Sequence, residues 1–283
     1  MIPGLEHYKI KWKIDSDRSI KPGLNSIQQA LNLLNNPEKS LQIVHLAGTN
    51  GKGSTLSFID SICQGHGLTV GKFMSPCILD VHDQIQINGL PITEQELDFI
   101  FDLFARSGLS GMLTDFELLT CAAFKHFECN NVDIALIETG MGGLYDSTNV
   151  VTPIVSIITS IALEHTNFLG DTIPQIATHK AGIIKGSRPV IVGKLPTEAY
   201  DVVRQTAQTV QALLYIYNEH FTLTGDMVET YTNNLTQMEF TSLQRGLIGE
   251  HQRINAAMAI TAFIEVAKVL NINVDAKLIQ QAL

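Results

Sequence analysis

Short apolar runs alternate along the chain with longer stretches in which apolar residues recur every three or four positions. Residues 132–139 and 153–160 are continuous apolar runs, as expected for strands of a parallel sheet that is covered on both faces. Residues 93–108 show helical spacing and open with a threonine followed by acidic residues, which is typical of a capped helix. This strand–helix rhythm predicts an α/β fold.

The same patterns predict most of the regular elements. Buried strands are expected at residues 41–47, 70–74, 132–139, 153–160 and 188–193. Helices are expected at residues 53–67, 93–108, 115–131, 171–184, 197–211 and 250–270. Residues 220–240 interrupt the rhythm and predict a β-hairpin or another small antiparallel addition. We therefore predict a doubly wound, mostly parallel sheet with a small antiparallel addition near the C-terminus.

The composition disfavours several classes of protein. The chain has 283 residues, of which 45% are hydrophobic and 17% charged, which fits one large or two small folded domains. A nucleic-acid-binding role needs a basic face, and the formal net charge of −9 disfavours it. The apolar runs are too short to span a bilayer, and the N-terminus lacks a signal-peptide core. We therefore expect a cytoplasmic protein with no membrane partner.

The four cysteines form no CxxC pair, which disfavours a disulfide framework or a zinc site. Cys121 and Cys129 fall in an apolar helical stretch. A thiol in such a place is expected to act as a small hydrophobic side chain.

The segment HLAGTNGKGST, residues 45–55, has the chemistry of a phosphate-binding loop between a predicted strand and a predicted helix. Its glycines let the backbone approach an anion closely, and the helix N-terminus adds the positive end of its dipole. Lys52 supplies a mobile charge for terminal phosphates, and Ser54 or Thr55 offers a hydroxyl. The spelling departs from the common G-x-x-x-x-G-K-[ST] loop, because Leu46 replaces the first glycine and Gly53 follows the lysine.

A carboxylate also closes one of the predicted strands. Glu138 follows the apolar run that begins at residue 132, and the glycine-rich stretch TGMGG comes directly after it. Ligands of open α/β sheets gather at the carboxyl ends of the strands, so we expect a functional role for Glu138.

The variant loop closely resembles that of the folylpolyglutamate synthase and dihydrofolate synthase family of the Mur ligase superfamily. The resemblance continues, in the family's order, through the blocks SPCILD, DFELLTCAAF, IETGMGGLYDSTNV, TSIALEHTNFLGDTI, HKAGIIK and GEHQRINAAMA. It implies a Mur ligase central-domain type of fold and the ATP-dependent addition of L-glutamate to a folate or to dihydropteroate. In that chemistry a substrate carboxylate attacks the γ-phosphate of ATP, and the amine of glutamate then displaces phosphate from the acyl phosphate. A monomer is the implied assembly.

The resemblance also implies roles for individual residues. ATP would be bound by Thr49, Asn50, Gly51, Lys52, Gly53, Ser54, Thr55 and Asn255. The pterin-bearing substrate would pack against Phe116, Asp146 and Thr148. Ser75 and Glu138 would bind one magnesium ion, and His165 and a carbamylated Lys180 a second. The expected catalytic residues are Lys52, Glu138, His165 and Lys180.

Some positions depart from the family's pattern. Leu144 stands where an arginine is expected, Cys77 where a histidine is expected, and Asp83-Gln84 where a Glu-Arg pair is expected. These departures leave open a nucleotide-binding paralogue that has lost ligase activity. A cell-wall or cyanophycin-type Mur ligase is a further alternative, although Gly-Lys-Thr-Thr would be expected in its loop. The family also has a C-terminal glutamate-ligase domain, so residues 1–283 are interpreted as the N-terminal ATP-binding domain, with that second domain expected after residue 283.

Overall fold

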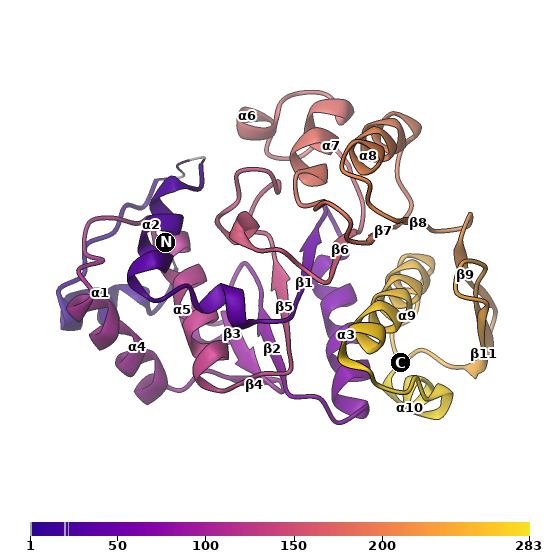
Figure 1. Ribbon diagram of the computed structural model, residues 1–283, viewed down its shortest axis with the longest axis horizontal. Coiled ribbons are helices and arrows are strands. Elements are labelled where there is room, and N and C mark those ends of the chain that lie inside the picture. The colour runs from indigo at the N-terminus through magenta and orange to yellow at the C-terminus, as the bar shows by residue number, and fades with distance from the viewer. Residues whose placement is uncertain (1, 20, 22) are drawn as a thin grey trace. The chain divides into compact units, whose positions relative to one another are not determined.

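The structure is a computed structural model that describes residues 2–19, 21 and 23–283 (Figure 1). The chain divides into two compact units, each built from several segments. The first contains residues 1–43, 69–140 and 145–152, and the second contains residues 44–68, 141–144 and 153–283. Each unit has its own group of strands and its own hydrophobic core.

The strands of the first unit lie in the order β4-β3-β2-β5. β2 and β5 are parallel, and β3 and β4 form an antiparallel hairpin at one side of β2. The bounds are β2 (Val70–Phe73), β3 (Ile85–Ile87), β4 (Leu90–Pro91) and β5 (Ile134–Glu138). The helices are α1 (Leu5–Trp12), α2 (Asn25–Leu33), α4 (Glu94–Arg106) and α5 (Asp115–Cys129), with 3₁₀ turns η1 (Pro37–Ser40), η2 (Val81–Gln84) and η3 (Ser147–Val150).

Local sequence explains where the two long helices of this unit begin. The Thr93 hydroxyl accepts a hydrogen bond from the backbone N–H of Glu96, and the Glu96 carboxylate accepts one from the backbone N–H of Thr93. α4 starts at the next residue, Glu94. Thr114 and Glu117 form the same capping box before α5. Each box satisfies backbone N–H groups that would otherwise lack a partner at the helix start.

The parallel strands of the second unit lie in the order β1-β6-β7-β8. α7 and α8 pack on one face of these strands, and α9, which also packs against α3, contacts β6 and β7 (Figure 1). The strands are β1 (Ile43–Ala47), β6 (Val155–Ile158), β7 (Val190–Val192) and β8 (Leu214–Ile216). The helices are α3 (Lys52–Gly65), α6 (Thr166–Leu169), α7 (Ile173–Ala181), α8 (Thr197–Thr209), α9 (Glu250–Leu270) and α10 (Ala276–Ala282).

The small antiparallel addition is a three-stranded sheet in the order β11-β10-β9. Its strands are β9 (Phe221–Gly225), β10 (Glu229–Asn233) and β11 (Met238–Leu243). β9 packs against α9, and Tyr231 in β10 reaches α9 through a hydrogen bond of 2.8 Å between its hydroxyl and that of Thr261. The sheet is thus attached to the helix that follows it in the chain.

The predicted fold class, the five predicted strands and the six predicted helices are confirmed. The hairpin β3–β4 was missed, although its turn is an Asn-Gly pair, Asn88-Gly89, with positive φ at both residues, which is a hairpin signal. The short strand β8 and the helices α1, α2, α6 and α10 were also missed. Cys121 is buried as expected, but Cys129 is exposed near the end of α5, so that part of the prediction is wrong.

Among the residues that the structure describes, none of the helices combines the length and the apolar character that crossing a membrane would require.

Candidate functional site

The phosphate loop connects the end of β1 at Ala47 to the start of α3 at Lys52. Glycine is required at two positions of this loop. Gly51 has a φ of 86°, and a Cβ there would lie 2.7 Å from Oδ1 of Asn255. A Cβ on Gly48, whose φ is 158°, would lie 1.9 Å from Oγ1 of Thr159. The backbone therefore adopts a conformation, and makes close contacts, that a side chain would not permit.

Residues that follow β6 hold the other side of the loop. The backbone N–H of Thr49 donates to the carbonyl of Ser160 at 2.9 Å, and that of Asn50 donates to the Ser160 hydroxyl at 2.9 Å. The Thr159 hydroxyl donates to the carbonyl of Asn50 at 2.6 Å. The Thr49 hydroxyl accepts a bond of 3.0 Å from the N–H of Ala162. Thr49 and Asn50, both expected to bind nucleotide, thus also fix the shape of the loop.

The first turn of α3 carries the polar groups expected to meet phosphate. Nζ of Lys52 donates to the carbonyl of Gly48 at 2.8 Å, so the lysine folds back over the loop. Thr55 is fully buried, and its hydroxyl has no hydrogen-bond partner among the described residues. A Cβ added to Gly53 would meet no atom within 4 Å. These features leave the start of α3 with donors and a positive dipole end that suit an anion.

The first turns of α9 contact this part of α3. Nε2 of Gln252 donates to the hydroxyl of Ser54 at 3.2 Å, and its Oε1 accepts from Nδ2 of Asn255 at 2.9 Å. The two side chains are three positions apart on one helix, so they share a face. The sequence identified Asn255 but missed Gln252. The signal was present, since both lie in the block GEHQRINAAMA.

Ser75 and Glu138 leave the same edge of the sheet in the first unit. β2 and β5 are parallel neighbours, with Phe73 opposite Ile137. Glu138 is the last residue of β5 and is buried, and Ser75 comes two residues after the end of β2. A carboxylate and a hydroxyl are oxygen ligands of the kind that Mg²⁺ prefers.

His165 and Lys180 are connected in the second unit by a residue that was not predicted. His165 is exposed, with a φ of 47°, at the start of α6. Lys180 in α7 is only 1% exposed, and its Nζ donates to Oε1 of Glu164 at 2.5 Å. A lysine buried to this extent requires a partner for its charge, or loss of that charge. Glu164 directly precedes His165. The contact between Glu164 and Lys180 therefore brings together the segments that carry the two predicted metal ligands, His165 and Lys180.

The predicted substrate residues lie in the first unit. The ring of Phe116 stacks on Phe73 with centroids 5.7 Å apart, and a Cβ added to Gly140 would lie 2.5 Å from that ring. Asp146 accepts hydrogen bonds from the backbone N–H of Thr148, at 3.0 Å, and from its hydroxyl, at 2.6 Å. Asp146 and Thr148 therefore form the cap of η3, and Phe116 covers the backbone just beyond β5.

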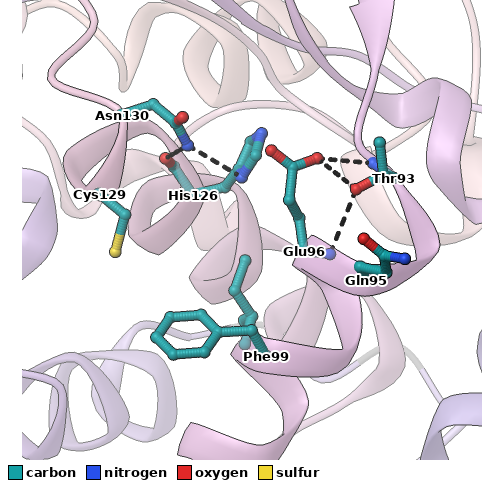
Figure 2. A pocket seen from close by; sticks show the side chains of 8 residues that line it. Thr93, Gln95, Glu96, Phe99, His126, Cys129 and Asn130 are labelled. Carbon is teal, nitrogen blue, oxygen red and sulfur yellow. Dashed lines mark hydrogen bonds between the residues drawn. The ribbon is translucent and has the colours of Figure 1, made fainter.

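The first unit has a hollow of about 490 Å³ that is lined by none of the predicted site residues (Figure 2). It lies between the start of α4 and the end of α5, and Phe99, His126 and Cys129 are among its lining residues. Burial lowers the pKa of His126, although the charge of Glu96 opposes that effect. Asn130 donates to the carbonyl of His126 at 2.8 Å and Glu96 belongs to the cap of α4. Because Asn130 and Glu96 already form hydrogen bonds at the ends of helices, this hollow is a poor candidate for the functional site.

The polar groups near the loop decide which metal ion or small molecule fits there. In the described part of the chain, no group of three His, Cys, Asp or Glu side chains could hold a metal ion. Magnesium would therefore need further oxygen ligands, such as those of a phosphate group. The glycine backbone of the loop, the start of α3 and Lys52 together suit such a phosphate ligand.

The sequence profile of the Mur ligase middle domain matches residues 46–263, which is most of the chain. The chain belongs to the Mur ligase family. Within it, the similarity is to the folylpolyglutamate synthases, as the sequence resemblance predicted. The match begins in β1, directly before the phosphate loop, and ends within α9 after Asn255.

The relatives of this Mur ligase chain include enzymes and solved structures. It is 39% identical over 257 residues to the dihydrofolate synthase/folylpolyglutamate synthase of Bacillus subtilis, an alignment that covers 86% of this chain and 59% of the relative. The apo form of L. casei FPGS matches with a TM-score of 0.90 and 31% identity, over 99% of this chain and 71% of that one. A structure described as an FPGS-AMPPCP-folate complex matches with a TM-score of 0.89 and 31% identity, over 99% and 71% of the two chains. The chain thus spans somewhat more than half the length of its Bacillus relative.

The structure gives physical roles to Asp83 and Leu144, two positions where the sequence resemblance led to the expectation of other residues. The carboxylate of Asp83 accepts hydrogen bonds from the backbone N–H groups of Ile78, Leu79 and Asp80. These bonds shape the loop after Ser75. Leu144 is packed so closely that a Cβ added to Gly182 would lie 2.5 Å from it. Asp83 therefore organises a loop, whereas Leu144 fills space at a position where an arginine was expected.

Proposed function

We propose that this chain binds Mg-ATP at the phosphate loop and forms the ATP-binding part of an enzyme that joins L-glutamate to a folate or to dihydropteroate. The observation that carries the proposal is the loop itself. Gly48 meets Thr159 and Gly51 meets Asn255 so closely that side chains are excluded, and Lys52 follows at the N-terminus of α3. The names of the relatives, and the AMPPCP and folate in one of the matching structures, support the same reaction.

The chain's own groups would act mainly by positioning and by neutralising charge. The N–H groups at the start of α3 would bind phosphate oxygens, and Lys52 would leave the carbonyl of Gly48 to reach the terminal phosphates. Gln252 and Asn255 would fix the side of the loop nearest α9. The substrate carboxylate attacks the γ-phosphorus, ADP leaves, and the glutamate amine then displaces phosphate from the acyl phosphate to give the amide.

Ser75 and Glu138 would hold one magnesium ion, and His165 and Lys180 a second. Magnesium supplies positive charge that stabilises the phosphate oxygens during transfer. Lys180 would serve as a carbamate: its neutral amine adds to the carbon of CO₂, and one N–H proton is lost to solvent. The ion pair between Lys180 and Glu164 must open for this to happen. The position of Lys180 supports the proposal, because its contact with Glu164 holds this buried side chain beside the segment that carries His165.

Phe116, Asp146 and Thr148 would contact the pterin-bearing substrate. The stacked ring of Phe116 offers an aromatic face, and its contact with Gly140 places it just beyond the end of β5. Such a face suits a flat heterocycle. The expectations of a monomer and of a cytoplasmic location stay predictions, which gel filtration and cell fractionation would test.

A second candidate function is nucleotide binding without ligation. Leu144 favours nucleotide binding without ligation. It packs closely against Gly182, and an arginine is expected at position 144 of an active ligase. The two candidates make different predictions for one experiment. The chain is incubated with Mg-ATP, labelled glutamate, and either dihydropteroate or tetrahydrofolate. It is tested alone and joined to the C-terminal part of the Bacillus subtilis relative.

Ligation predicts a labelled folate product from the joined protein. Nucleotide binding with no product from either pterin substrate would contradict the ligase and favour the second candidate.

A further inference from the structure

A buried carboxylate connects the small antiparallel sheet to the start of α9. Glu229, the first residue of β10, is 2% exposed. Its Oε2 accepts from Nε of Arg245 at 2.6 Å, and its Oε1 accepts from Nη2 of Arg245 at 2.9 Å and from Nε of Arg253 at 2.7 Å. Burial raises the pKa of Glu229, but the hydrogen bonds and charges of the two arginines outweigh it and hold the pKa below its usual value. The carboxylate is therefore ionised and held by two guanidinium groups.

The two arginines fix the backbone where α9 begins. Nη1 of Arg245 donates to the carbonyls of Leu247, at 2.7 Å, and Gly249, at 3.2 Å, and Gly249 is the residue before the helix. Nη2 of Arg253, in the first turn of α9, donates to the carbonyl of Gly225 at 2.7 Å. Glu229 thus joins the end of β9, the start of β10, the segment before α9 and the first turn of α9.

The same first turns of α9 contact the phosphate loop. Gln252, which directly precedes Arg253, donates to Ser54. Asn255, two residues beyond Arg253, lies against Gly51 so closely that no Cβ fits between them. Arg253 therefore lies, in sequence, between two residues of α9 that contact the loop, and Glu229 holds Arg253.

We propose that Glu229 is a positioning residue that keeps Gln252 and Asn255 of α9 against the phosphate loop. This inference rests on the proposed function, because it treats the loop as the nucleotide site. A buried ion pair gives little net stability, since removing charges from water offsets most of their attraction. Its rigid, two-pronged geometry instead fixes orientation. This geometry sets the position of α9 against the loop.

The test compares Glu229→Gln with Tyr231→Phe in the whole 283-residue chain. Tyr231 also joins the small sheet to α9, but through Thr261 in the middle of the helix, so Tyr231→Phe removes a buried contact without touching the first turns. Three quantities are measured for each: the melting temperature, the Kd for Mg-ADP, and hydrogen exchange in peptides that cover residues 48–55.

We expect both variants to melt at a lower temperature than the wild type. Glu229→Gln should weaken Mg-ADP binding about tenfold, the equivalent of one good hydrogen bond, and speed exchange in residues 48–55. Tyr231→Phe should leave both quantities at wild-type values. If Glu229→Gln does not fold, Arg253→Gln, which removes one arm of the contact at a partly exposed residue, should give the same pattern.

Two results would overturn the inference: wild-type exchange and affinity in the Glu229 or Arg253 variant, or equal losses in Tyr231→Phe. Failure of the wild type to bind Mg-ADP would instead contradict the proposed function. The exchange measurement needs no nucleotide, so it would still decide whether Glu229 positions the loop.

Discussion

Replacing Gly51 by alanine tests whether the phosphate loop has the shape described. Gly51 combines a φ of 86° with close contact to Asn255, whose Oδ1 would lie 2.7 Å from the new Cβ. Gly53, two residues later, is the matched control, because it lies in α3 and a Cβ there meets nothing within 4 Å. Both changes add one methyl group, at positions two residues apart.

The expected cost at Gly51 has two parts. A left-handed backbone conformation costs a residue with a Cβ about 1–2 kcal/mol. The methyl group must also displace the Asn255 side chain, which would break its hydrogen bond to Gln252 at a cost of about 1 kcal/mol. Gly51→Ala should therefore lower the free energy of unfolding by about 2–3 kcal/mol. Gly53→Ala should raise it by about 0.5–1 kcal/mol, because alanine is the better helix former.

The assay is urea denaturation of the two variants and the wild type without nucleotide, followed by circular dichroism. Measurement without ligand separates the shape of the loop from any contact that a methyl group would make with phosphate. A Gly51→Ala variant as stable as the wild type, or the two variants changing stability in the same direction by the same amount, would refute the geometry of the loop.

Three further results are expected. Lys180→Ala should lose ATP turnover that short carboxylic acids partly restore, and ¹³C-bicarbonate should give a carbamate signal in the wild type; full activity in CO₂-free buffer would contradict the carbamate. Glu138→Gln should weaken the magnesium dependence of nucleotide binding and change the melting temperature little, whereas a collapse of melting with unchanged magnesium dependence would make Glu138 structural. The pKa of Glu229 is below the usual 4.5, so its stabilising effect should be complete above pH 4.5 and disappear as the pH falls through the folded-state value. The stability difference between the wild type and Glu229→Gln should shrink accordingly in denaturation curves below pH 4.5, and a difference that grows there would show the wrong sign.

The sequence predicted those features that depend on neighbouring residues in the chain. The bounds of α9 were predicted to the residue because an apolar helical pattern runs without interruption from Glu250 to Leu270. The phosphate loop was predicted because its glycines, lysine and hydroxyls are contiguous between a strand and a helix. In both places one local pattern determines the structure.

Contacts between distant positions could not be predicted in this way. Glu164 was missed as the partner of Lys180, which is 16 residues away and buried. Glu229 lies 24 residues before Arg253, and nothing in the pattern of β10 distinguishes its carboxylate from those on the surface. Which buried charge meets which partner depends on how the elements pack, and that information is spread over the whole chain.

The central claim, that the loop around Lys52 binds nucleotide, is tested most directly by calorimetric titration of Mg-ATP into the 283-residue chain. The wild type is compared with Lys52→Ala and with Lys194→Ala, an exposed lysine of the same unit that serves as the control. A charged hydrogen bond contributes about 1.5–3 kcal/mol, so Lys52→Ala should bind about 10- to 100-fold more weakly, while Lys194→Ala binds like the wild type. Equal affinity of all three proteins, or no binding by the folded wild type, would contradict the claim.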